Sequence, residues 1–227
     1  MLHWKYGVKG GGRKLLAAVV VALAMAGTVA AGPVAAGPTV IAFGDSLTQG
    51  HGLPQAEGFV PQLQDWLKAQ GRDVTVVNAG VSGDTTAGGL ARIGWTLGEK
   101  ADAVIVELGA NDMLRGLPVS EVRKNLNGIL QAIRAKGLPV LLIGVTAPAN
   151  YGPAYQHGFD AVYPALAQKY HALLVPDFFA ALKAQGDTEA NMQRYMQPDG
   201  LHPTAQGVKL IVAAIGPEVE KLLAEAK

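Results

Sequence analysis

The stretch Thr39-Val40-Ile41-Ala42-Phe43-Gly44-Asp45-Ser46-Leu47-Thr48-Gln49-Gly50 decides the fold of this chain. Its first five residues are apolar or β-branched, which predicts a strand buried on both faces. Gly44 permits a tight turn, so Asp45 and Ser46 stand where the strand gives way to a loop or helix. A serine there can lie beside the free N–H groups of a helix N-terminus, the setting that acyl transfer needs. Asp45 and Ser46 are equally ordinary as turn or N-cap residues, and this stretch alone leaves both interpretations open.

The first 36 residues have the layout of a secretory signal peptide. Four basic residues precede an apolar run from Leu15 to Ala30, and small residues follow as far as Ala36. The alternative is a membrane anchor, but the run is shorter than the roughly 20 residues that a spanning helix needs. We therefore expect cleavage between residues 30 and 36, no stable membrane anchor afterwards, and a periplasmic or secreted protein. Residues 37–227 are enough for a single domain.

The composition excludes several kinds of partner. The chain carries 19 basic and 18 acidic residues, and removal of the four basic residues of the leader leaves 15 against 18, a net charge of −3. No basic run remains to follow a phosphate backbone, so nucleic-acid binding is not expected. Cysteine is absent, which excludes disulfides and a cysteine-linked lipid. No spacing of His, Asp and Glu indicates a metal site, and we expect no cofactor and a monomer.

Strand-like and helix-like segments alternate along the predicted mature chain. Helical periodicity follows Phe59 as far as Gly71, and a glycine-interrupted helix is expected from Thr85 to Leu97. Ser120 is the expected N-cap of a third helix. The last helix is expected to open at Pro203, and Gly207 and the Gly216-Pro217 pair predict a break or kink in it. This alternation predicts an α/β fold with a parallel sheet and helices on both faces. The five expected strands are Thr39–Phe43, Val74–Asn78, Ala103–Leu108, Pro139–Val145 and Ala172–Val175.

Polar residues follow each of the first four expected strands. In parallel sheets ligands bind beyond the carboxyl ends of the strands, so these segments are expected to meet at one edge. They are Gly44-Asp45-Ser46, Asn78 to Asp84, Gly109-Ala110-Asn111-Asp112 and Thr146 to Gly152. A loop explains the residue types, but it does not explain why groups suited to acyl transfer follow each consecutive strand.

A nucleophilic Ser46 needs a base, and His202 is the histidine with a carboxylate at a useful spacing. In Asp199-Gly200-Leu201-His202-Pro203, the glycine-containing turn lets Asp199 reach one ring nitrogen and leaves the other for a substrate. The other mature-chain histidines lack this partner and are expected in turns, loops or packing positions: His51, His157 and His171. An isolated Asp-x-x-His is more often the plain end of a loop, so the pair gains its meaning from the remaining motifs.

Taken together, four short blocks resemble the signatures of the GDSL, or SGNH, hydrolases. The order and approximate spacing match over essentially the whole mature chain, and the subgroup it resembles most is that of exported bacterial acyl-thioesterases, arylesterases and lysophospholipases. The blocks are Gly44-Asp45-Ser46-Leu47, Asn78-Ala79-Gly80, Gly109-Ala110-Asn111-Asp112 and Asp199-Gly200-Leu201-His202. The resemblance implies a three-layer α/β/α fold with a five-stranded parallel sheet of flavodoxin-like order.

The resemblance also implies roles for individual residues. Ser46 would be the nucleophile and His202 the base, oriented by Asp199. The N–H groups of Ser46 and Gly80 and the side-chain amide of Asn111 would form the oxyanion hole. The remaining aspartates of the motifs are better interpreted as supporting or capping residues: Asp45, Asp84 and Asp112. One departure from the subgroup is Ala147, where a larger apolar residue is expected, which leaves the shape of the acyl pocket open.

The expected substrates are small-molecule esters, thioesters or lysophospholipids. Leu114, Pro148 and Tyr151 are the candidate substrate-binding residues, because aromatic and apolar side chains cluster after Asn111 and after the fourth strand. Such a wall suits an acyl chain better than a sugar, although the same residues can simply pack the loop. Two alternatives remain: a carbohydrate O-deacetylase on the same fold, and a non-catalytic flavodoxin-like module that binds phosphate.

Overall fold

A computed structural model describes residues 37–98 and 100–226 of the chain. The predicted signal peptide, residues 1–36, lies outside the described residues. The domain is a parallel five-stranded sheet with strand order β2-β1-β3-β4-β5, as the flavodoxin-like prediction requires. The strands are β1 (Thr39–Gly44), β2 (Thr75–Gly80), β3 (Ala103–Glu107), β4 (Val140–Ile143) and β5 (Leu173–Val175). All five predicted strands are confirmed to within two residues at each end.

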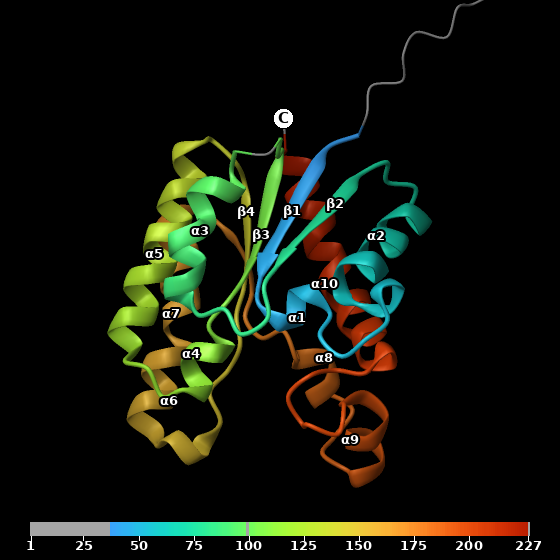
Figure 1. The fold of residues 1–227 in the computed structure, drawn as a ribbon, viewed down its shortest axis with the longest axis vertical. Helices are drawn as coiled ribbons and strands as arrows, with labels where there is room; N and C mark the ends of the chain where they lie inside the picture. The colour runs from blue at the N-terminus through green and yellow to red at the C-terminus, as the bar shows by residue number, and fades with distance from the viewer. Residues whose placement is uncertain (1–36, 99, 227) are drawn as a thin grey trace, which may run out of the picture. The chain divides into compact units, whose positions relative to one another are not determined.

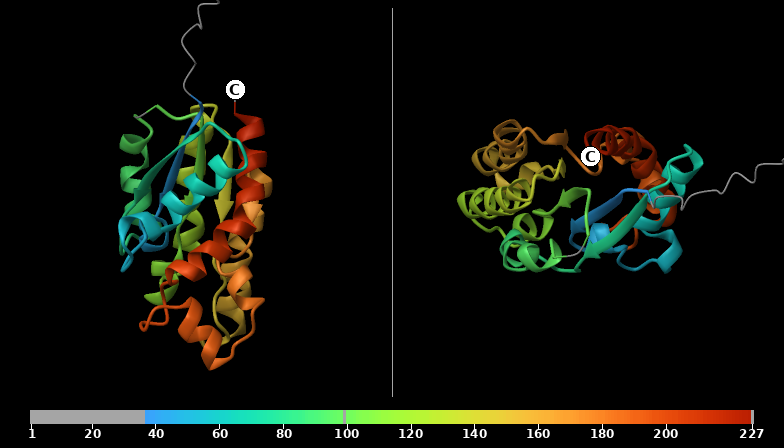
Figure 2. Two further views of the ribbon diagram at one scale, coloured as in Figure 1. Left: turned by 90° about the vertical axis from the view of Figure 1, so that its right-hand side faces the viewer. Right: turned by 90° about the horizontal axis from the view of Figure 1, so that it is seen from above.

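Helices cover both faces of the sheet (Figure 1), and the view from above separates the layers (Figure 2). One face carries α3 (Thr86–Thr96), α5 (Val119–Ala135) and α7 (Val162–Tyr170), which pack against one another. The other face carries α2 (Phe59–Ala69) and α10 (Ala205–Glu225). The three-layer α/β/α architecture is thereby confirmed.

Short helices gather at the carboxyl ends of the strands, at the bottom of Figure 1. They are α1 (Ser46–Gln49), α4 (Ala110–Leu114), α6 (Pro153–Asp160), α8 (Ala180–Lys183) and α9 (Glu189–Tyr195), with the 3₁₀ turns η1 (Gln55–Glu57) and η2 (Ala149–Tyr151). In the described part of the chain, no helix is long and apolar enough to cross a membrane.

The central strands are continuous apolar runs in the sequence because both of their faces lie in the core. All residues of β3 and β4 are buried, and β1 is buried from Val40 onward, because helices lie on both faces. Helix α5 contributes a fully buried stripe at helical spacing: Val122, Leu126, Ile129, Leu130 and Ile133. Edge strand β2 is more exposed. The buried core therefore reaches the carboxyl ends of β1 and β3, next to Ser46.

Two predicted helix starts are wrong, those at Ser120 and Pro203. Ser120 is the second residue of α5 rather than its N-cap, because Pro118, with a φ of −58°, already has a helical φ and the first turn follows it directly. Pro203 does not open α10. It pairs with Met196 in an isolated bridge, and Thr204 is the N-cap, with Oγ1 accepting from the Gly207 N–H at 3.2 Å.

Helix α10 also runs unbroken through Gly216 and Pro217. A Cβ at Gly216 would lie 2.6 Å from the Trp66 ring, so the glycine permits close packing of α10 on α2. That packing outweighs the local tendency of a Gly-Pro pair to end a helix.

We predict that Gly44→Ala destabilises the domain, because β1 ends in contact with α1. An added Cβ would lie 2.0 Å from Thr48 Oγ1 and 2.6 Å from the Glu107 carbonyl oxygen. Overpacking of this kind lowers the free energy of unfolding by about 1–3 kcal/mol, measurable by urea denaturation.

The matched control is Gly94→Ala, inside α3, where an added Cβ has no atom within 4 Å among the described residues. It should raise the free energy of unfolding by about 0.5–1 kcal/mol. Equal effects of the two substitutions would contradict the proposed contact between β1 and α1.

Candidate active site

A serine, a histidine and an aspartate form a hydrogen-bonded chain beyond the carboxyl ends of the strands. Ser46 is the first residue of α1, and its Oγ lies 2.9 Å from Nε2 of His202. Nδ1 of His202 lies 2.7 Å from Oδ2 of Asp199. Asp199 and His202 stand between α9 and α10, so the fold brings together residues 156 positions apart. The order is that of a nucleophile, a base and an orienting carboxylate.

A tight turn holds Asp199 against the histidine. Gly200 has a φ of +67°, and Oδ1 of Asp199 accepts from the N–H groups of Leu201 at 2.9 Å and His202 at 3.0 Å. Slight burial acts to raise the pKa of Asp199, but hydrogen bonds from the His202 ring and these two N–H groups outweigh it and lower the pKa to about 2. An ionised Asp199 only accepts, so His202 carries its proton on Nδ1 and offers Nε2 to Ser46.

The buried carboxylate of Asp45 orients the residues on both sides of it. Asp45 is the N-cap of α1, and its Oδ1 accepts from the Leu47 N–H at 3.0 Å. Its Oδ2 accepts from the side-chain amide of Asn111 at 3.0 Å. Burial raises the pKa of Asp45 to about 6, although the hydrogen bonds from Leu47 and Asn111 act in the opposite direction. One side chain therefore sets both the start of α1 and the direction of the Asn111 amide.

Glu107, the last residue of β3, is a second buried carboxyl beside Asp45. Its Oε2 accepts from Thr48 Oγ1 at 2.9 Å, and its Oε1 receives no hydrogen bond from the residues that the structure describes. Complete burial, and then the negative charge of Asp45, raise the pKa of Glu107 well above its usual range. Two carboxylates this close cannot both ionise readily, so we assign the shared proton to Glu107.

Of the predicted oxyanion donors, Ser46 and Asn111 line the cavity and Gly80 does not. The Gly80 N–H already donates to Oδ1 of Asn78 at 3.0 Å, and a Cβ there would lie 2.4 Å from the Gln49 nitrogen, beneath α1. Gly83, three residues further on, does line the cavity, and its N–H has no acceptor among the described residues. The sequence places both glycines in one loop after β2, and only the course of the turn separates them.

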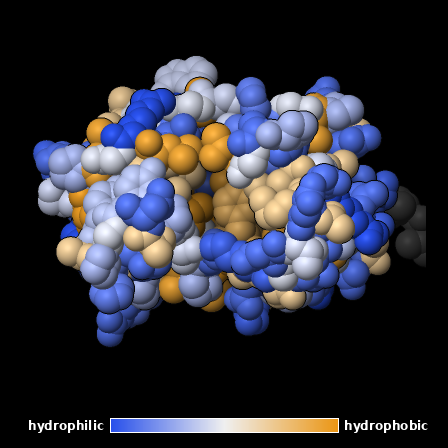
Figure 3. Space-filling model, turned by 90° about the horizontal axis from the view of Figure 1, so that it is seen from below, coloured by the Kyte–Doolittle hydropathy of each residue, from blue (hydrophilic) through white to orange (hydrophobic). Residues whose placement is uncertain are grey.

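The triad opens on a cavity of about 710 Å³. Figure 3 views this face from below and shows apolar side chains gathered around a hollow. Of the predicted substrate-binding residues, Leu114 and Pro148 line the cavity, whereas Tyr151 lies off it and stacks on Tyr155 with ring centroids 5.4 Å apart. Tyr151 therefore packs the loop, which is the alternative that the sequence left open.

Much of the apolar wall comes from the segment between β5 and Asp199, which carries no motif. Helices α8 and α9 and the residues around them contribute Phe179, Leu182, Met192, Tyr195 and Met196. These residues, together with Leu201, could be suspected from the sequence only as apolar positions close to the Asp199–His202 pair. Polar residues also line the cavity, among them Lys183, which pairs with Asp177 outside the lining at 2.7 Å.

Of the other histidines that the structure describes, His51 lines the cavity and His157 and His171 do not. The ring centroid of His51 lies 4.7 Å from that of His202, and its Nδ1 lies 3.3 Å from Ser82 Oγ. His157 lies in α6, and His171 ends α7 with a φ of +50°. Within the described residues, no group of three or more His, Asp and Glu side chains could hold a metal ion.

Comparisons with known proteins agree with this geometry. The model of the GDSL-like Lipase/Acylhydrolase family matches residues 42–210. The chain belongs to this family. It is 40% identical over 186 residues to the esterase TesA of Pseudomonas aeruginosa, covering 82% of this chain and 89% of that protein. It is 34% identical to the thioesterase 1/protease 1/lysophospholipase L1 of Escherichia coli over 82% of this chain and 85% of that protein.

A solved structure supports the same assignment. The SGNH-hydrolase family esterase AlinE4 is 45% identical, with a TM-score of 0.66 over 82% of this chain and 96% of its own. Membership of the family confirms the predicted enzyme class, a GDSL/SGNH-type serine hydrolase of esters and thioesters. The roles of the individual site residues remain predictions.

We predict that Glu107→Gln makes stability less dependent on pH. The folded-state pKa values of Asp45 and Glu107 are raised, so between about pH 4 and pH 6 the folded chain binds more protons than the unfolded chain. Stability therefore falls as pH rises through this window. Glutamine keeps an acceptor for Thr48 and removes one titration. Urea denaturation at pH 4.5, 6 and 7.5 should show that the free energy of unfolding falls less with pH in the variant than in the wild type. An equal fall in both proteins would contradict the assignment of the proton to Glu107.

Proposed function

We propose that Ser46, His202 and Asp199 hydrolyse carboxylic esters and thioesters through an acyl-enzyme. The observation that carries the proposal is the hydrogen-bonded chain from Asp199 through His202 to Ser46, which opens on an apolar cavity. A phosphate-binding module has no use for this arrangement, so the non-catalytic alternative has no support from the geometry.

In the first half of the reaction, Ser46 Oγ attacks the substrate carbonyl carbon and its proton passes to His202 Nε2. The ionised Asp199 stabilises the imidazolium through the hydrogen bond to Nδ1. The tetrahedral intermediate collapses, the carbon–oxygen or carbon–sulfur bond breaks, and the leaving alcohol or thiol takes the proton from Nε2. An acyl ester on Ser46 remains.

In the second half, water attacks the acyl carbon and gives its proton to Nε2. The second tetrahedral intermediate expels Ser46 Oγ, which recovers that proton, and the carboxylic acid leaves. Both intermediates carry an oxyanion, for which we propose the N–H groups of Ser46 and Gly83 and the amide of Asn111 as donors. Support for Gly83 in place of Gly80 comes from its place on the cavity wall and from its N–H, which has no acceptor in the part of the chain that the structure describes, whereas the Gly80 N–H is already bonded to Asn78.

The acyl chain is the part of the substrate that the cavity suits. The cavity volume of about 710 Å³ is in the range for small-molecule sites. The cavity wall carries Leu114, Met192 and Leu201. We propose short-to-medium acyl esters and thioesters as substrates, with lysophospholipids as a further candidate. We also propose that residues 1–36 direct export to the periplasm or beyond, on the strength of their basic start and apolar run.

We predict that Ser46→Ala and His202→Ala each reduce kcat by roughly 10⁴–10⁶-fold, and that the double variant loses little more, because the pair acts as a unit. Hydrolysis of an aryl ester measures all three. His157→Ala is the matched histidine control and should stay active. An inactive His51→Ala together with an active His202→Ala would refute the assignment of the base.

We predict that kcat/KM for aryl esters rises with acyl length until the cavity is filled. Each buried methylene contributes up to about 0.8 kcal/mol, close to fourfold in kcat/KM. A series from two to sixteen carbons measures the limit. Activity confined to acetyl esters would contradict the acyl cavity and favour the carbohydrate deacetylase.

A further inference from the structure

The turn that carries Gly83 lies outside every strand and helix, between β2 and α3. Gly83 has a φ of +79°, and its neighbours Val81 and Ser82 are exposed. A donor to an oxyanion must be held firmly, because a misplacement of about 1 Å can reduce a rate about 10²-fold. Backbone bonds join the Val81 N–H to the Gly44 carbonyl and the Asp84 N–H to the Val81 carbonyl, and side chains supply the other contacts, such as that of Arg115 with the Gly83 carbonyl at 2.9 Å.

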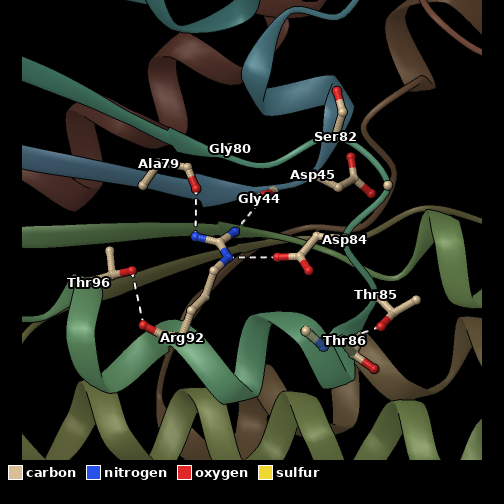
Figure 4. Close-up of polar contacts among 12 residues, drawn as sticks. Gly44, Asp45, Ala79, Gly80, Ser82, Asp84, Thr85, Thr86, Arg92 and Thr96 are labelled. Carbon is tan, nitrogen blue, oxygen red and sulfur yellow. Dashed lines mark hydrogen bonds and ion pairs between the residues drawn. The ribbon is translucent and has the colours of Figure 1, made fainter.

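The half-buried side chain of Arg92, on α3, reaches three separate segments at once (Figure 4). Its Nε donates to Oδ2 of Asp84, next to Gly83, at 2.6 Å. Its Nη1 donates to the carbonyl of Ala79 at 2.9 Å, and its Nη2 donates to the carbonyl of Gly44 at 2.9 Å. The guanidinium also lies 3.9 Å from the centroid of the Phe43 ring.

These three acceptors lie beside the proposed nucleophile and the proposed oxyanion donor, whose distance from each other the reaction depends on. Gly44 ends β1 and is followed by Asp45 and the proposed nucleophile Ser46, whereas Ala79 lies near the end of β2. Asp84 belongs to the Gly83 turn. The planar guanidinium presents donors in fixed directions, which a lysine ammonium on a flexible stem cannot reproduce.

A second side chain ties the start of α3, just after the turn, to α4, the helix that also carries Asn111. The carboxylate of Asp112, which is buried, accepts from the Thr86 N–H at 2.8 Å and from Thr86 Oγ1 at 2.6 Å. Asn125 donates to the same Thr86 hydroxyl at 3.2 Å. The turn is thus held at Asp84 toward β1 and at Thr86 toward α4.

We propose that Arg92 is a positioning residue for the oxyanion hole, which sets the Gly83 N–H relative to Ser46 by joining Asp84 to the ends of β1 and β2. The proposal rests on the proposed function, since it takes Gly83 as an oxyanion donor. Arg92 touches neither substrate nor reacting atoms and acts through the turn.

The test compares Arg92→Lys with Arg72→Lys, using an aryl ester of fixed chain length. Lysine keeps the charge opposite Asp84 and loses the fixed pair of carbonyl contacts. Arg92→Lys should therefore lower kcat about 10²-fold and change KM less than threefold, because the oxyanion forms only in the transition state. Arg72 is the matched control. It makes one surface ion pair, with Glu220 at 2.8 Å, and its replacement should leave kcat unchanged.

Chemical rescue separates positioning from plain stability. Added guanidinium, kept well below the concentration that unfolds the protein by circular dichroism, should restore kcat at least tenfold in Arg92→Ala. It should not restore kcat in Asn111→Ala, which lacks a donor instead of a support. If Arg92→Ala does not fold, Asp84→Asn serves in its place. It keeps the shape of the side chain and should lower kcat without a matching rise in KM.

An unchanged kcat in Arg92→Lys would overturn the proposal. A loss of kcat in Arg92→Ala that accompanies unfolding, and that added guanidinium does not restore, would also overturn it. An active Ser46→Ala would instead overturn the proposed function. The two failures are therefore distinguishable.

Discussion

The site depends on one buried carboxylate, that of Asp45, at the point where β1 ends. Its two oxygens receive the Leu47 N–H and the Asn111 amide, so a single group orients both the helix that begins at the proposed nucleophile and a proposed oxyanion donor. Burial disfavours the charge and raises the pKa of Asp45 to about 6, yet ionisation is what makes both oxygens acceptors. The neighbouring Glu107 resolves this conflict by keeping its proton, which leaves Asp45 free to ionise at neutral pH.

At the same edge of the sheet, buried carboxyl groups fix the orientation of their neighbours although they add little to the stability of the fold. A core of well-packed apolar residues ends at β1 and β3, and immediately beyond it lie Asp45, Glu107 and Asp112. Buried carboxyls add little net stability, but each has few orientations that satisfy its hydrogen bonds. The polar layer therefore has few alternative arrangements beside the proposed nucleophile, whereas the apolar wall of the cavity includes exposed side chains of α9 and the loop after it, such as Met192 and Leu201.

The sequence predicts those features that follow from local chemistry. Continuous apolar runs identify the strands, and a glycine-containing Asp-x-x-His can close on itself without help from the rest of the chain. The start of α5 was misplaced for a local reason, since Pro118 caps the helix two residues before Ser120. The break predicted at Gly216-Pro217 is absent for a tertiary reason, since Gly216 packs closely on the Trp66 ring.

The choice between Gly80 and Gly83 as the proposed donor depends on contacts that the sequence does not show. The loop after β2 offers two glycines three residues apart, and a free N–H on either would serve an oxyanion equally well. What separates them is the side chain of Asn78, which occupies the Gly80 N–H, and the contact of Arg92 with Asp84, which holds the turn next to Gly83. The first interaction is local to the end of β2, whereas the second depends on where α3 lies against the sheet. A motif therefore names the segment that supplies a donor, but the residue within it depends on the course of the turn and on the side chains that contact it.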